Sequence, residues 1–134
     1  MTALRRTVVA AAVTLLIACG GDGTGPTAGT LTVSLTTPNS GLDGGAVVVL
    51  SAPAAPGSVT PAAGLTLWGG PINTTNATIA LTGTLSTGTI LMLQVDDINK
   101  VAQYSATLRE VAATAAGGFV LRSSLAGYSL AVVK

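Results

Sequence analysis

Apolar and polar residues alternate with period two along much of the chain after residue 30. In residues 31–36 three apolar residues alternate with threonine and serine, and residues 77–82 and 104–109 repeat the pattern. Strict alternation is typical of a strand with one buried and one solvated face. Together with apolar β-branched runs, it predicts strands at 31–36, 46–50, 65–67, 77–82, 89–95, 104–109, 119–123 and 128–133.

Turn-forming residues separate these segments. Pro38-Asn39-Ser40-Gly41, Asp43-Gly44-Gly45, residues 53–57 and Gly69-Gly70-Pro71 each interrupt the apolar pattern. About eight short strands with turns between them are typical of an antiparallel β-sandwich, of jelly-roll or immunoglobulin-like type. We therefore expect residues 30–134 to form one all-β domain, whose strand order the sequence does not determine.

Residues 100–116 fit two interpretations. Their apolar residues also follow helical spacing, with Gly117 as a C-cap. Serine and threonine between them weaken a helix, and the neighbouring segments are strand-like. We predict a strand. The residues that share the helical spacing are Val101, Tyr104, Leu108, Val111 and Ala115.

The first eighteen residues have the pattern of an export signal. Residues 1–6 are basic, and residues 7–18 form an apolar run of twelve that ends at Ala18. A membrane-spanning helix needs about 20 apolar residues, so this run is too short for a permanent anchor. A basic start before a short apolar run predicts a signal helix that is removed on export.

The end of this run, Leu16-Ile17-Ala18-Cys19, resembles the lipobox of bacterial lipoproteins. The resemblance implies cleavage before Cys19, acylation of its thiol, and a membrane anchor made by the attached acyl chains. Two other interpretations remain: an ordinary secretory signal cut after Gly20, or a structural cysteine. A glycine-rich stretch reaches residue 29, so residues 19–29 are expected to be a flexible tether. By resemblance to enteric lipoproteins, Gly20 in place of aspartate favours the outer over the inner membrane.

A second resemblance concerns the domain itself. The apolar run Ala46–Leu50 after a glycine-rich turn, and the segment Leu81–Val95, are similar to cohesin-type and carbohydrate-binding-type sandwich modules. The resemblance implies a jelly-roll-like sandwich. It does not carry dockerin binding over, because no partner-surface residues match.

Charge and composition restrict the chemistry. Only 8% of residues are charged, and removal of the signal leaves four basic and five acidic residues. No basic stripe supports nucleic-acid binding. The chain has no histidine and one cysteine, which excludes Ser-His-Asp triads, Cys-His dyads and His or Cys zinc sites. We therefore expect no enzyme activity and no cofactor.

Two groups of residues are candidates for binding. Asp96, Asp97 and Asn99, with help from Asp43, offer oxygen ligands for calcium, although a solvated turn after a strand is the favoured interpretation. On a strand the adjacent Asp96 and Asp97 would face opposite ways, which makes them a poor glycosidase pair. Trp68 is a candidate ligand contact, but we expect it to cap the core instead.

Tyr128, after Gly127, is expected to be a corner residue whose hydroxyl bonds to the backbone.

The signal, the tether and the predicted sandwich together favour a lipid-anchored envelope protein with a non-catalytic binding or scaffolding module, whose ligand is an envelope protein or a glycan. The alternative is a structural or assembly lipoprotein inside the envelope, and a hydrolase is a disfavoured third class. The sequence determines neither the ligand nor the oligomeric state.

Overall fold

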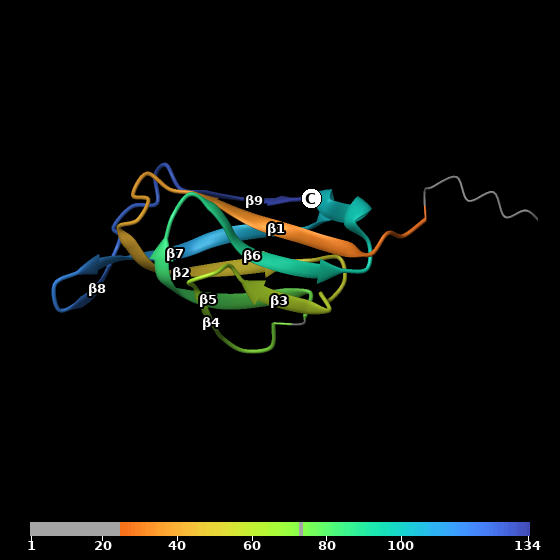
Figure 1. Ribbon diagram of the computed structural model, residues 1–134, viewed down its shortest axis with the longest axis horizontal. Helices are drawn as coiled ribbons and strands as arrows, with labels where there is room; N and C mark the ends of the chain where they lie inside the picture. Colours follow the sequence, from red (N-terminus) through yellow and green to blue (C-terminus); the bar gives the residue numbers. More distant parts are fainter. Residues whose placement is uncertain (1–24, 73) are drawn as a thin grey trace, which may run out of the picture.

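The computed structural model of the protein describes residues 25–72 and 74–134. The proposed signal, residues 1–18, lies outside these residues, and so do Cys19 and the tether up to residue 24. The described chain forms nine strands and a short 3-10 helix, η1, in two layers (Figure 1). The elements are β1 (Gly29–Thr36), β2 (Asp43–Ser51), β3 (Ser58–Pro61), β4 (Thr66–Trp68), β5 (Asn76–Leu85), β6 (Gly88–Val95), η1 (Ile98–Gln103), β7 (Ser105–Ala115), β8 (Gly118–Leu121) and β9 (Ser129–Val133).

The strands form two antiparallel sheets. One sheet has the order β3-β6-β1-β9, and the other has the order β4-β5-β2-β7-β8. All the strand pairs are antiparallel. The predicted all-β sandwich is confirmed, and its core is the aliphatic layer between the sheets.

The period-two pattern explains which side chains enter this core. Alternate residues of β1 are buried, and the same holds for β5. Residues opposite each other on paired strands share a face, so burial in one strand predicts burial in its neighbour. Leucine, valine and isoleucine dominate, as the scarcity of aromatic residues requires. The least exposed apolar side chains are Leu31, Val33, Val48, Ile79, Leu81 and Leu91.

The structure corrects several predicted boundaries. Strand β3 had not been predicted, because it has four residues and lies between the 53–57 break and the next turn. Strand β2 begins at Asp43, three residues before the predicted start, so the Asp43-Gly44-Gly45 segment is strand instead of turn. Residues 100–116 belong to two elements. The 3-10 helix η1 ends at Gln103, and β7 begins at Ser105, so the predicted strand is confirmed for most of this segment.

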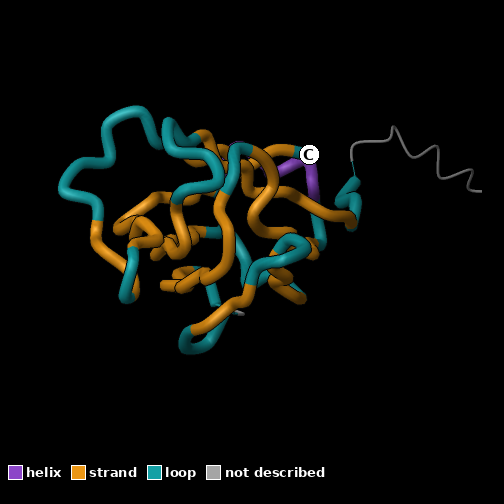
Figure 2. The backbone as a smooth tube through the Cα atoms, turned by 60° about the vertical axis from the view of Figure 1, so that its left-hand side comes forward, coloured by secondary structure: helices purple, strands orange, loops and turns teal. Residues whose placement is uncertain are grey.

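The helix η1 lies beside the C-terminus (Figure 2). Lys134 at the end of the chain donates from Nζ to Oδ1 of Asn99 at 3.3 Å. No helix in residues 25–72 and 74–134 is long and apolar enough to cross a membrane.

Candidate binding face

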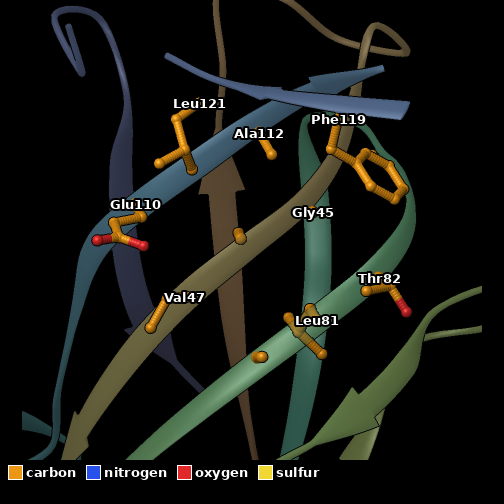
Figure 3. Close-up of a pocket in the computed structure, with 11 residues that line it drawn as sticks. Gly45, Val47, Leu81, Thr82, Glu110, Ala112, Phe119 and Leu121 are labelled. Atoms are coloured by element: carbon orange, nitrogen blue, oxygen red, sulfur yellow. The ribbon is translucent and has the colours of Figure 1, made fainter. Parts of the chain in front are cut away.

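The outer face of the five-stranded sheet carries a shallow apolar hollow of about 200 Å³ (Figure 3). Its floor comes from β2, β5 and β7, and its wall comes from β8. Only two lining residues, Thr82 and Glu110, have polar side chains. The lining residues are Gly44, Gly45, Ala46, Val47, Ala80, Leu81, Thr82, Glu110, Ala112, Phe119 and Leu121.

Strand β8 supplies the wall of the hollow. Phe119 lies opposite Thr114 and Leu121 opposite Ala112 on β7, which places both large side chains on the outer face. Their exposed fractions are 62% and 64%. The ring of Phe119 lies against the backbone of Gly44, where a Cβ would overlap Phe119 Cε1. The absence of a side chain at Gly44 therefore lets the Phe119 ring pack directly against the β2 backbone.

Trp68 is on the same face at the opposite edge of the sheet. It lies opposite Ala80, a lining residue, and it is 56% exposed. Its indole Nε1–H donates to Oγ1 of Thr82 at 2.8 Å, which holds the ring close to the hollow. The expectation that Trp68 caps the core is therefore wrong. Strand β4 is a short edge strand, and an edge position leaves its outward residue without a covering neighbour.

A buried polar cluster joins the two sheets elsewhere. The Asp43 side chain is fully buried, and Oδ1 accepts hydrogen bonds from Arg122 Nε at 2.8 Å and from an Arg122 terminal nitrogen at 2.7 Å. Oδ2 accepts from the Tyr128 hydroxyl at 2.6 Å and from Thr37 Oγ1 at 3.3 Å. Hydrogen bonding to Asp43 raises the pKa of Arg122 above its ordinary value. Each oxygen of the Asp43 carboxylate accepts two hydrogen bonds from within the protein, which leaves none of its lone pairs for a ligand. The cluster is therefore structural.

This cluster corrects the expectation for Tyr128. Its hydroxyl donates to the Asp43 carboxylate and accepts from Asn39 Nδ2 at 2.8 Å, instead of bonding to the backbone. The residue does fix a corner, as expected, but it does so through side chains that come from distant parts of the chain.

The calcium candidates do not converge with Asp43. Asp97 is the N-cap of η1, and its Oδ1 accepts from the backbone N–H groups of Thr27 at 3.2 Å and Asn99 at 3.0 Å. These two bonds lower the pKa of Asp97. Asp43 starts β2 at the other end of the sandwich from η1 (Figure 1). In the described residues no three acidic, histidine or cysteine side chains group as metal ligands. The arrangement favours the interpretation of these residues as a capped turn.

A comparison of the chain with protein-family models, characterised proteins and solved structures found no match. The resemblances to the lipobox and to cohesin-type modules therefore stay predictions.

Sequence reasoning had singled out Trp68 but had missed the β8 wall and Glu110. Residues 119–123 were predicted as a strand, yet nothing in the pattern showed that this strand lies at a sheet edge. The run Phe119-Val120-Leu121 carried a weak signal, because three successive apolar residues cannot all enter the core from one strand.

Proposed function

We propose that this protein is a lipid-anchored envelope lipoprotein whose sandwich acts as a non-catalytic binding or scaffolding module. The binding surface is the outer face of the five-stranded sheet. The observation that carries the proposal is the apolar hollow on this face, with Trp68 at one edge and Phe119 and Leu121 at the other.

Exposed apolar residues are common singly, but a contiguous apolar patch is typical of an interaction site. Aromatic side chains contribute much of the energy at protein interfaces and stack on sugar rings. Glycine and alanine in the floor leave room between the aromatic edges. The face therefore offers an apolar surface against which apolar groups of a partner can pack.

The chemistry of the face supports binding over catalysis. Among the lining side chains, Glu110 supplies one carboxylate and Thr82 one hydroxyl, which already accepts a hydrogen bond from Trp68. Hydrolysis of a glycosidic bond is typically catalysed by a pair of positioned carboxyl groups. The lining lacks such a pair.

The anchoring part of the proposal depends on Cys19 and the tether. In Figure 1 the described chain enters β1 at one end of the sandwich, whereas β8 lies at the other end. A lipid on Cys19 would hold the first end near the membrane through residues 19–29. The β8 end of the hollow would then point away from the bilayer and be accessible to partners.

The single tryptophan of the chain provides the test. The full protein from bacterial membranes, in detergent, is titrated with envelope glycans and with solubilised envelope proteins while Trp68 emission is followed. A ligand that covers the face should shift this emission to shorter wavelength and should bind at least tenfold more weakly to Leu121→Ser. Val133→Ser, on the other sheet, is the matched control and should bind as the wild type does. A ligand that binds all three equally well would contradict the proposed face.

A further inference from the structure

Strand β7 carries one cation and one anion side by side where it passes the hollow. Leu108 and Val111 of β7 both pack on the core, although three positions separate them. The register between β2 and β7 shifts between Val47 and Val48, which marks a β-bulge. The two residues inside this interval, Arg109 and Glu110, are both exposed.

The bulge explains this arrangement. In a regular strand neighbouring side chains point to opposite faces, so one of the two charges would be forced into the core. The extra residue of the bulge lets both side chains project outward. Glu110 lies opposite Val47 and lines the apolar hollow, and its carboxylate is visible there (Figure 3).

Neither charge has an ionic partner among residues 25–72 and 74–134. The one ion pair in the described residues joins Arg122 to Asp43. A cation and an anion that lie next to each other beside a mostly apolar hollow form a self-complementary pattern. Under a twofold axis, residue i of one copy meets residue j of the other and j meets i.

We propose that the occupant of this face is a second copy of the same chain. Two copies pack outer face to outer face, Arg109 of each copy pairs with Glu110 of the other, and the apolar residues around the hollow fill the space between the sheets. The inference rests on the proposed function, because it takes the same face as the binding surface and names its partner.

The size of the face fits such a pairing. The five strands have 3, 10, 9, 11 and 4 residues, and at about 3.4 Å per residue and about 4.8 Å between strands the face has a planar extent of roughly 600 Å². A standard interface buries about 800 Å² per partner. Within the hollow itself a sugar chain fits less well, because a glycan needs several hydrogen-bonding groups and the lining offers two polar side chains.

The experiment uses two full-length copies with different affinity tags, co-expressed in bacteria and solubilised from the membrane. Wild-type copies should co-purify, with a dimer mass in native mass spectrometry. Arg109→Glu in both copies places four carboxylates together, and Glu110→Arg in both places four cations together. Each of these pairs should reduce co-purification at least tenfold.

Mixing the two variants is the decisive measurement. A copy with Arg109→Glu then meets a copy with Glu110→Arg, every facing charge is opposite, and co-purification should return. A merely structural effect of either substitution would not be rescued by mixing. Lys100→Glu, on η1, is the matched control for a charge reversal elsewhere and should co-purify as the wild type does.

Other results would overturn the inference. Wild-type copies that do not co-purify, masses larger than a dimer, or variants that are not restored by mixing exclude the twofold pairing. If the copies stay apart while another envelope component shifts Trp68 emission, the dimer is wrong and the proposed binding function stands. If the copies do not associate and no envelope component binds, both the dimer and the proposed binding function are contradicted.

Discussion

At the scale of single residues, the buried charge of Asp43 illustrates how this sandwich tolerates polar groups in its interior. Asp43 has an exposed fraction of 1%, and an unpaired carboxylate there would be strongly unfavourable. Arg122, Tyr128 and Thr37 together fill its hydrogen-bonding capacity. Arg122 and Tyr128 come from the segment between β8 and β9, and Thr37 directly follows β1, so the cluster ties both sheets together at one point.

We expect Asp43→Ala to lower the free energy of unfolding by about 3 kcal/mol, because it leaves the Arg122 guanidinium without its partner. The value is at the lower end of the usual range, since the Arg122 side chain remains 27% exposed. Denaturant unfolding followed by circular dichroism measures the change. Tyr128→Phe removes one bond to the same carboxylate and should cost about 1.5 kcal/mol. Equal stability of Asp43→Ala and the wild type would contradict a structural role for the cluster.

Asp97 is predicted to make stability depend on pH. Hydrogen bonds from Thr27 and Asn99 hold its folded pKa below the ordinary value of 3.8. A depressed folded pKa means that the stabilising contribution is complete above 3.8 and is lost as the pH falls through the lower folded value. Thermal melting should therefore show Asp97→Ala less stable than the wild type at neutral pH, with the difference shrinking well below pH 3.8. Asp97→Asn keeps an acceptor that does not titrate, so its melting should lie closer to the wild type at neutral pH. A difference that does not change with pH would exclude the carboxylate as the cause.

At the scale of elements, the crossing from one sheet to the other between β3 and β4 depends on a close backbone approach. The turn between them places the carbonyl group of Gly64 against Gly83 of β5, where a Cβ would overlap the carbonyl oxygen. Gly83 also has φ +128°, which side chains with a Cβ rarely adopt. The position of β4, and therefore of Trp68, depends on this contact.

Gly83→Ala should destabilise the protein more than Gly88→Ala, although both positions have positive φ. At Gly88, with φ +137°, nothing lies within 4 Å of an added Cβ, so only backbone strain of about 1–2 kcal/mol is expected. Gly83→Ala adds the overlap with Gly64, and we expect a loss of more than 2 kcal/mol in all. Denaturant unfolding of the two variants measures the difference. Equal losses would mean that the Gly64 turn moves away without cost.

The outer edge of the five-stranded sheet is the other feature that appears only at the scale of elements. Strand β8 is exposed at all four positions and carries no charge. Natural edge strands are usually protected by charges, proline or a covering segment, because free backbone groups invite pairing with another chain. Its apolar sequence is consistent with a surface that is covered by a partner in the assembled state.

At the scale of the whole molecule, the two ends of the sandwich have different proposed roles. The proposed tether would join the end where β1 begins, and the β8 wall lies at the opposite end (Figure 1). If Cys19 carries a lipid, as proposed, the exposed face would meet a second copy anchored in the same membrane. Confinement to a membrane raises the effective concentration of the copies, which would favour a moderate interface.

The intact mass of the protein purified from bacterial membranes is predicted to be that of a chain that begins at Cys19 plus acyl groups. Cys19→Ser should lack the acyl mass, because serine offers no thiol to the modifying enzymes. An unmodified wild-type chain that begins at Gly21 would show an ordinary secretory signal instead. That outcome would remove the anchor and tether from the proposed function, while the tests of the binding face would still apply.

The sequence by itself determined the all-β class, most of the strands and the aliphatic core, because period-two burial and turn residues are local signals. It also identified Trp68 and the Cys19 motif as candidates. Tertiary structure alone decided that Trp68 is exposed, that Asp43 is buried with Arg122 and Tyr128, and that β8 lies at an edge beside the hollow. These features depend on which strands become neighbours. Strand order is set by packing between segments that are far apart in the chain, which alternation along a single strand does not encode.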